Sequence, residues 1–383
     1  MEKRKILFLP IGGIYQQDDL DAATRVINAV VENNGSFFPL PEENDFQQAF
    51  AEHEGAKKAI AVNSCGTALD CCMMSLGIKE KDEVITTPLT FVCTAGTAIA
   101  RGAKVVFADI DPNTLNLNPS KVREKITEKT KVIIPVHFAG LACNINDFEK
   151  ISQETKIPII YDAAHAIGAL YNGNTIGGSG KASCYSFQSN KNMTCLGEGG
   201  SVTTNDEEFA EKVRQMKTFG YVYGEKLRVV SIGFNYRMTK VQLAVGITQL
   251  SKINMVNQMK REKMLILNNL LSDIPEIILP PGIDNNHACH LYVIRINTDT
   301  FSITGEEFSR HLWAVYGVQT AKHYPAVWEW EAFANLGYNG KDCPEAAKAC
   351  SQVISMPVFP KTEVDDLEYM TWAVKQTIYD LKH

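Results

Sequence analysis

Seven short apolar runs alternate with helical patterns between residues 19 and 220, at a spacing of roughly 20 residues. This alternation is typical of βαβ units, in which right-handed crossovers make consecutive strands parallel and place helices on both faces of the sheet. It predicts an α/β fold with a mostly parallel, seven-stranded sheet between helices. The expected strands are 59–62, 82–87, 104–110, 131–138, 157–164, 182–187 and 201–205. The expected helices are 19–35, 42–56, 66–77, 90–102, 119–126, 145–155 and 206–220.

The length of the chain predicts two lobes. Single hydrophobic cores seldom grow beyond about 250–300 residues, and this chain has 383. A helical pattern runs without a break over 240–271 and is expected to link the lobes. We predict a large domain over 1–255, which begins with an extended arm, and a small α+β domain over 256–383.

Two residues in the middle of the chain suggest the chemistry. The apolar run KIPIIYDAAHA delivers Asp162 at the carboxyl end of a predicted strand, which is where open α/β sheets place their ligands. Lys191 follows in SFQSNKN, between the strand-like run ASCYSF and a glycine-rich turn. Most lysines lie on a solvated surface, but one sheltered beside apolar strands has a lowered pKa and becomes a candidate nucleophile.

Pyridoxal 5′-phosphate (PLP) needs both of these groups. It forms a Schiff base with a lysine amine, and a carboxylate keeps its pyridine nitrogen protonated. We therefore predict that Lys191 and Asp162 serve a PLP enzyme. The turn NSCGT, just before a predicted helix, could receive the phosphate at Ser64, Gly66 and Thr67. A simple helix cap is the alternative interpretation of this turn.

Composition excludes several other classes of protein. The net charge of −6 and the lack of a basic run argue against nucleic-acid binding. No apolar run approaches the roughly 20 residues of a membrane span, and the amino terminus lacks a cleavage site. The ten cysteines are scattered through apolar segments, which favours buried free thiols and a cytoplasmic protein. His287, Cys289 and His290 lie in HACH, but no partner ligands accompany them, so no metal is expected.

With these residues in place, the chain resembles the DegT/DnrJ/StrS family of sugar aminotransferases, which are fold-type-I PLP enzymes. The resemblance runs from the first helix to SMPVFP through VNSCGTALD, TPLTFV, IPVHFAG, YDAAHAIGA, SFQSNKNMTCLGEGG, GFNYRMTKVQLAVGITQL and HYPA. Each motif alone is weak, but the combination is specific.

The resemblance implies roles for four residues around the cofactor ring. Lys191 would form the internal aldimine, and Asp162 would pair with the pyridinium. His165 would lie beside the ring, where many members have Gln. Phe91 would stack on the ring, although a place in the core is the alternative for an aromatic residue of this kind.

Other residues are implied at the phosphate and at the substrate. Gly66, Thr67 and Ser186 would bind the phosphate, together with Asn235 from a partner subunit. The resemblance therefore also implies a homodimer with shared active sites. His323 and Tyr324 would reach the substrate.

The reaction implied is a ping-pong transamination from glutamate or glutamine to a keto-sugar, in particular one linked to a nucleotide. A non-sugar ketone, such as a cyclitol or an aminobenzoate precursor, is an alternative acceptor. A PLP-dependent sugar dehydratase is disfavoured because such relatives carry His in place of Lys191. A regulatory relative without turnover is disfavoured because Lys191, Asp162 and Ser186 are all present.

Overall fold

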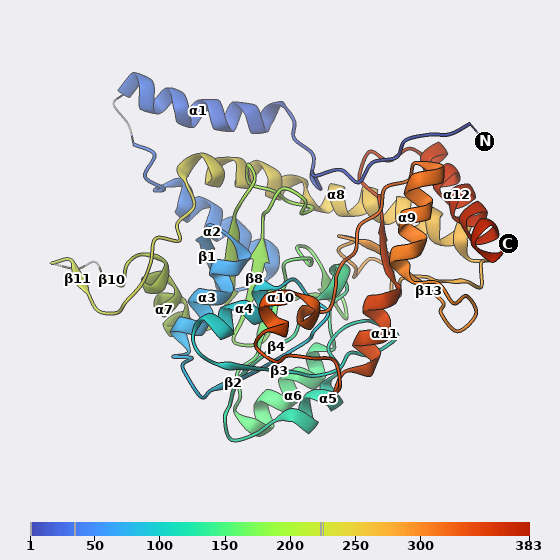
Figure 1. The fold of residues 1–383 in the computed structure, drawn as a ribbon. Coiled ribbons are helices and arrows are strands. Elements are labelled where there is room, and N and C mark those ends of the chain that lie inside the picture. The colour runs from blue at the N-terminus through green and yellow to red at the C-terminus, as the bar shows by residue number, and fades with distance from the viewer. Residues whose placement is uncertain (1, 34–35, 223, 225) are drawn as a thin grey trace.

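The computed structural model describes residues 2–33, 36–222, 224 and 226–383, and Figure 1 shows its two lobes. The strands of the large lobe are β1 (Lys58–Val62), β2 (Glu83–Thr86), β3 (Lys104–Phe107), β4 (Thr130–Ile134), β5 (Ile160–Asp162), β8 (Ala182–Ser186) and β9 (Gly200–Thr204). Its helices are α1 (Gln17–Asn33), α2 (Glu42–Glu54), α3 (Cys65–Ser75), α4 (Cys93–Ala100), α5 (Pro119–Lys125), α6 (Ile145–Thr155) and α7 (Glu207–Lys217). The predicted end of the first helix, at residues 34 and 35, lies outside the described residues.

These seven strands form the main sheet of the large lobe, in the order β1-β9-β8-β5-β4-β2-β3. Two ladders, β1-β9-β8-β5 and β3-β2-β4, are joined by parallel bridges between Ile133 and Ile159 and between Val136 and Asp162. The pairings of β5 with β8 and of β2 with β3 and β4 are parallel, while β9 runs antiparallel to both β1 and β8. The prediction of a mostly parallel sheet is therefore confirmed.

Both faces of the sheet are covered by helices, as a mainly parallel sheet requires. On β1, Ile60 packs into the core on one face while Ala61 packs into the core on the other. Helices α3, α4 and α7 contribute to the first core, and α2, α5 and α6 contribute to the second. The same alternation on β5 sends Ile160 to one side and Tyr161 to the other. Asp162 is the last residue of β5 and therefore lies at the carboxyl end of the strand, at the edge of the core.

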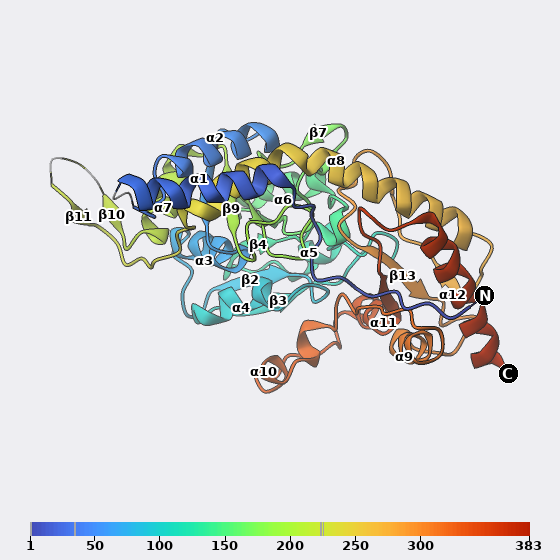
Figure 2. The same ribbon diagram turned by 90° about the horizontal axis from the view of Figure 1, so that it is seen from above.

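The small lobe contains a three-stranded antiparallel sheet. Its elements are β12 (Ile277–Ile278), β13 (Tyr292–Ile296), β14 (Val353–Met356), α9 (Gly305–Tyr316), η2 (Val327–Glu329), α10 (Glu331–Ala334), α11 (Pro344–Gln352) and α12 (Val364–Lys382). Figure 2 shows α12 beside the end of α8 (Lys240–Leu271), which passes from one lobe to the other, and α9 lies next to α11 and α12. Leu243 belongs to a core of the large lobe and Leu271 to the core of the small one. The domain boundary between residues 255 and 256 stays a prediction.

Several short elements of the large lobe were not expected from the sequence. These are η1 (Phe138–Gly140) and the strands β6 (Leu170–Tyr171), β7 (Asn174–Thr175), β10 (Tyr221–Val222) and β11 (Arg228–Val229). The pair β10 and β11 follows the predicted helix over 206–220, and residues 223 and 225 of its loop are outside the described residues. Each of these strands has only two paired residues, which is too short for an alternation of apolar and polar residues to be recognised in the sequence.

The amino-terminal arm crosses between the lobes. Ile6 makes a parallel bridge with Val318 in the small lobe. Further on, Gly12 donates a backbone hydrogen bond to Ser189, in the loop that carries Lys191. A Cβ atom on Gly12 would lie 2.1 Å from the carbonyl oxygen of Asn190, so only glycine allows this approach. The arm thus supports the Lys191 loop from outside.

All ten cysteines are free thiols, nine of them buried and Cys93 partly exposed. In the part of the chain that the structure describes, no cluster of side chains could hold a metal ion. His287 accepts the backbone N–H of Cys289 through Nδ1, which accounts for one of its ring nitrogens. Over the same residues, no helix combines the length and the apolar character needed to cross a membrane. The cytoplasmic location stays a prediction.

Candidate active site

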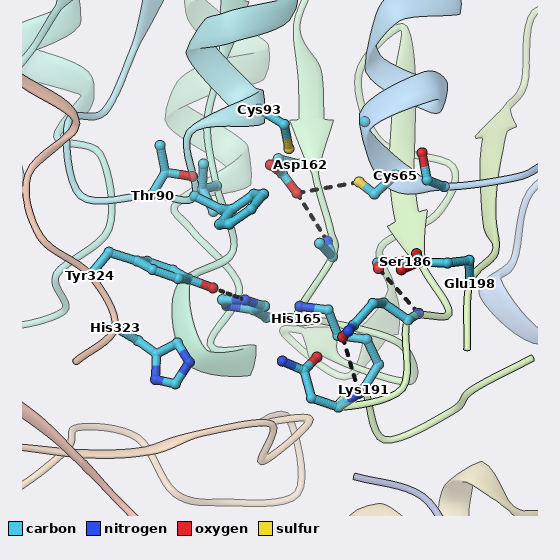
Figure 3. A pocket seen from close by; sticks show the side chains of 17 residues that line it. Cys65, Thr90, Cys93, Asp162, His165, Ser186, Lys191, Glu198, His323 and Tyr324 are labelled. Carbon is cyan, nitrogen blue, oxygen red and sulfur yellow. Dashed lines mark hydrogen bonds between the residues drawn. The ribbon is translucent and has the colours of Figure 1, made fainter. Parts of the chain in front are cut away.

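A cavity of about 520 Å³ opens at the carboxyl end of β5, where the two lobes meet. Its volume is in the range of pockets for small molecules and cofactors. The predicted site residues that line it are Gly66, Phe91, Asp162, His165, Ser186, Lys191, His323 and Tyr324. Figure 3 shows Asp162 at the top of the view, Ser186 on the right, and Tyr324 and His323 on the left. Residues from distant parts of the sequence therefore converge on one space.

Lys191 enters this cavity from the loop between β8 and β9. The residue is only 9% exposed. Among the described residues, Lys191 Nζ has no hydrogen-bond partner within the protein, and the residue borders the cavity. Burial lowers the pKa of Lys191. This effect is larger than the opposing effect of Asp162 and the neighbouring thiols, which raise the pKa. A larger fraction of its amine is therefore unprotonated at neutral pH than for an ordinary lysine, as a Schiff-base nucleophile requires.

Asp162 is held at the end of β5 by three donors. Its Oδ2 accepts the hydroxyl of Thr94 at 2.7 Å. Its Oδ1 accepts the backbone N–H of Ala164 at 3.1 Å and lies 3.8 Å from the thiol of Cys65. Burial raises the pKa of Asp162, although these hydrogen bonds favour the ionised form. A cation placed at this end of the cavity would therefore be stabilised by Asp162 and would in turn stabilise its charge.

The amino terminus of α3 forms another wall of the cavity. Ser64 caps the helix by accepting the backbone N–H of Thr67, and the Thr67 hydroxyl accepts the N–H of Ser64. Thr67 does not line the cavity, and its N–H and hydroxyl are both used in this cap. Gly66 and Ser186 do line it, so the unpaired N–H groups and positive dipole of the first helical turn face the space. The role of Thr67 at the phosphate stays a prediction.

His165 and Tyr324 form a hydrogen-bonded pair on the opposite side of the cavity. The Nδ1 atom of His165 accepts the backbone N–H of Ala139, so the single proton of the neutral ring lies on Nε2. His165 Nε2 is 2.9 Å from Tyr324 Oη and donates to it. Burial keeps the pKa of His165 well below its usual value, and the charge of Lys191 adds to the effect. The Tyr324 hydroxyl proton remains available for a molecule in the cavity.

The remaining predicted residues occupy different positions. Phe91 is 55% exposed in the turn before α4 and not in the core, with its ring centroid 6.1 Å from that of Tyr324. His323 lies beside Tyr324, and its Nδ1 is 2.8 Å from Ser355 Oγ. Asn235 does not line the cavity of its own chain. A role for Asn235 in such a cavity would therefore require a second subunit.

Sequence reasoning missed several residues around these groups. Thr94, which holds Asp162, is three positions after Phe91, and this spacing could have indicated a shared helical face. Cys65, Cys93 and Glu198 also border the cavity. Cys65 lies in the NSCGT turn that the sequence did indicate, but no local signal identifies Cys93 and Glu198, which reach the cavity through the packing of α4 and the β8–β9 loop.

With the geometry in place, comparison with known proteins identifies the family. The sequence profile of the DegT/DnrJ/EryC1/StrS aminotransferase family matches residues 18–375. The chain belongs to this family. It is therefore a PLP-dependent aminotransferase of fold type I.

Three relatives illustrate the similarity. The spore coat polysaccharide biosynthesis protein SpsC of Bacillus subtilis is 35% identical over 350 residues, which is 88% of this chain and 90% of that protein. PseC of Helicobacter pylori, an aminotransferase of pseudoaminic acid biosynthesis, is 25% identical with a TM-score of 0.87, covering 98% of this chain and 100% of PseC. A synthase of 3-amino-5-hydroxybenzoic acid is 26% identical with a TM-score of 0.87 and the same coverage.

Proposed function

We propose that this family member transfers an amino group from glutamate or glutamine to a keto-sugar, in particular one linked to a nucleotide. The observation that carries the proposal is the convergence of Lys191 and Asp162 on one cavity, with a helix amino terminus beside them. Two similar proteins, SpsC and PseC, are named for polysaccharide and pseudoaminic acid biosynthesis, which supports a sugar acceptor.

The residues present fit the cofactor of the family. Lys191 would hold it through the amine, Asp162 through the ring nitrogen, and Gly66 and Ser186 through the phosphate, with Thr67 shaping the turn that presents Gly66. Phe91 would cover one face of the ring. When bound, PLP supplies an electron sink that stabilises negative charge on the α-carbon of the amino donor. The free N–H groups at the start of α3 and the free amine of Lys191 are the features that match it.

Each of the residues around the cavity would have a separate role in the transfer. Lys191 Nζ would take the proton from the α-carbon of the donor, would deliver it to the cofactor carbon that keeps the amino nitrogen, and would move a proton back to the acceptor carbon in the second half-reaction, because it is the free amine at the cavity wall. Asp162 holds a negative charge where the ring nitrogen needs one. His165 orients Tyr324, whose hydroxyl donates into the cavity, and His323 lies where the acceptor would enter. The keto acid formed from the donor would leave before the acceptor binds, and the same residues would then act in the opposite direction, which is a ping-pong scheme.

The absorption spectrum of the purified protein tests this proposal. We expect a visible band from the lysine-linked cofactor, and we expect L-glutamate or L-glutamine, added without an acceptor, to replace it with a near-ultraviolet band. A band that neither donor changes would contradict the proposed donors. A protein that shows no visible band, even after PLP is added, would contradict the role of Lys191.

A non-sugar ketone is the second candidate acceptor. The similarity to a synthase of 3-amino-5-hydroxybenzoic acid, at the same TM-score as PseC, favours it. A panel of nucleotide-linked keto-sugars and cyclic ketones would separate the two. Once the donor has removed the visible band, its return with a ketone without a sugar, and with no keto-sugar, would replace the first proposal with the second.

The proposed homodimer rests on exposed apolar side chains. Helix α1 exposes Leu20, Ile27 and Val31, and the segment after it exposes Phe37 and Phe38. A second exposed group, near β10 and β11, consists of Leu227, Val229, Val230, Ile232 and Phe234. Arg237 lies over the rings of both Phe38 and Phe219, so the two groups adjoin. An apolar surface of this kind marks an interaction site, and Asn235 lies within it.

Complementation between two impaired variants tests the shared site. Asn235→Ala removes the amide that would reach the phosphate of the partner's cofactor, so we expect weaker PLP binding, by roughly 10-fold for one lost charge-assisted hydrogen bond. Co-expression of Asn235→Ala with Lys191→Ala should produce heterodimers in which one of the two sites is intact, and so partial activity at low PLP. Sedimentation of the protein as a monomer would contradict the shared active site. So would co-expressed variants that are no more active than each variant expressed alone.

A further inference from the structure

A buried network of polar side chains lies behind the loop that carries Lys191. Its centre is Asn192, which is 5% exposed. The side-chain amide of Asn192 donates to Asn257 Oδ1 and to the carbonyl oxygen of Ala288, both at 2.8 Å. The next residue after Lys191 is thus fixed to a helix and to a loop that lie far away in the sequence.

The oxygen of the same amide is held by a lysine. Lys260, which is 2% exposed, donates from Nζ to Asn192 Oδ1 at 2.8 Å and to the carbonyl oxygen of His290 at 2.6 Å. The Nδ1 atom of His290 is 3.4 Å from Asn192 Oδ1. The oxygen and both N–H groups of the Asn192 side chain therefore have partners, and no small rotation of the amide keeps them all.

Lys260 has an unusual environment for a lysine. In the described parts of the chain it makes no ion pair with a carboxylate. Burial lowers the pKa of Lys260 to about 7, and the nearby charge of Lys191 contributes in the same direction, while Cys289 opposes it. A neutral amine can still donate both observed hydrogen bonds. The role of Lys260 therefore lies in the two hydrogen bonds that its amine donates, and it does not require a positive charge.

The network joins segments from both lobes. Asn257 and Lys260 lie three positions apart on α8, which places them on the same side of the helix. Asn257 Nδ2 also donates to the carbonyl oxygen of Ile167, after β5, at 2.9 Å. Ala288 donates its backbone N–H to Gly140 and lies shortly before the small lobe's strand β13. The Lys191 loop is therefore held from inside by this network, as Gly12 supports it from outside.

We propose that Lys260 is a positioning residue for Lys191: by holding Asn192, it fixes the loop from which the Lys191 amine enters the cavity. This inference rests on the proposed role of Lys191. Lys260 is not among the residues that line the main cavity, so it acts on the cofactor indirectly, through Asn192 and the carbonyl oxygen of His290.

The test compares two buried lysines of the same helix. Lys260→Met keeps the approximate length of the side chain and removes its two donors. Lys252→Met is the matched control, because Lys252 is 7% exposed, also lies on α8 and pairs with Asp18 and Asp19 rather than with the Lys191 loop. Both variants lose a buried polar interaction, but only one loses the contact with Asn192.

The main readout is the rate at which the visible band appears when PLP is added to the cofactor-free protein. We expect Lys260→Met to slow this rate by about 10-fold to 100-fold, the size of effect that a displacement of about 1 Å produces at a reacting group. The kcat for the donor that bleaches the band should fall in parallel while its KM stays within about twofold, because Lys260 does not touch the substrate. Lys252→Met should lower Tm without changing the rate per folded molecule.

A second variant keeps the test independent of whether Lys260→Met folds well. Asn192→Ala should slow capture of PLP to a similar extent, and the double variant should be no slower than the slower single one, because both act on one contact. Normal capture by folded Lys260→Met, or equal slowing by Lys252→Met, would overturn the inference. If the wild-type protein itself showed no visible band, the proposed role of Lys191 would fail instead.

Discussion

Replacement of Lys191 by alanine is expected to abolish amino-group transfer, with a loss of more than about 10⁴-fold. The variant loses the nucleophile that holds the cofactor and the base that moves the proton, and acid–base catalysis alone contributes about 10²-fold to 10⁴-fold. Steady-state assays with the donor that bleaches the wild-type band measure the effect. The other cavity residues are unchanged, so the variant should still bind PLP without the linkage.

The spectrum provides the control for this variant. Lys191→Ala should lack the visible band of the wild-type protein but retain cofactor through dialysis better than a variant with a damaged phosphate site. Removal of a lysine whose pKa burial has lowered should not destabilise the fold, because its ammonium form is unfavourable there. Appreciable turnover by well-folded Lys191→Ala would show that another amine does the chemistry and would overturn the assignment.

Replacement of Asp162 by asparagine is expected to reduce kcat by about 10²-fold to 10³-fold, the usual cost of losing one preorganised electrostatic contact. The amide is almost the same size as the carboxylate and can still accept the Thr94 hydroxyl, so the geometry of the end of β5 should survive. What is lost is the negative charge that would keep the ring nitrogen protonated. The smaller loss than for Lys191→Ala is part of the prediction.

A matched variant separates charge from packing at this position. Thr94→Val removes the 2.7 Å hydrogen bond to Asp162 Oδ2 but keeps the carboxylate. We expect it to cost less than Asp162→Asn, since the charge remains and only its orientation is loosened. If Asp162→Asn retained nearly full kcat, or if Thr94→Val were the more damaging change, the proposed pairing of Asp162 with the ring nitrogen would be wrong.

The contrast between Asp162 and Thr94 also shows how far local sequence can indicate a site. Asp162 follows a continuous apolar run, and Lys191 follows another, so the pattern of the chain alone locates the carboxyl ends of two strands. Thr94 carries no such signal. It reaches Asp162 because the packing of α4 on α3, β2 and β3 brings the start of this helix to the carboxyl end of β5, and that packing is not encoded in the sequence around Thr94.

Lys191 and Lys260 are both buried, but the sequence indicates the burial of only one of them. Lys191 stands out in the sequence because it interrupts a buried pattern in a glycine-rich setting. Lys260 lies in MVNQMKREKM, which has the composition of a solvated helix face, yet it is only 2% exposed. Helical spacing places Lys260 on the same face as the buried Val256 and Met264, but only the loop 287–290 lying over α8 supplies the partners for its amine.

Periodicity and neighbouring residues were enough to establish the class of fold, the succession of strands and helices, the long helix over 240–271 and the two groups that one cofactor requires. These features depend on residues close together in the chain, so they are visible in one dimension. Four others needed the folded chain: Thr67 is used in the cap at Ser64 and does not line the cavity, Phe91 is exposed, His165 donates to Tyr324, and Lys260 holds Asn192. The exposure of Phe91 and the last two contacts depend on how segments distant in sequence pack, and that packing is set by the sum of many weak contacts across the whole core.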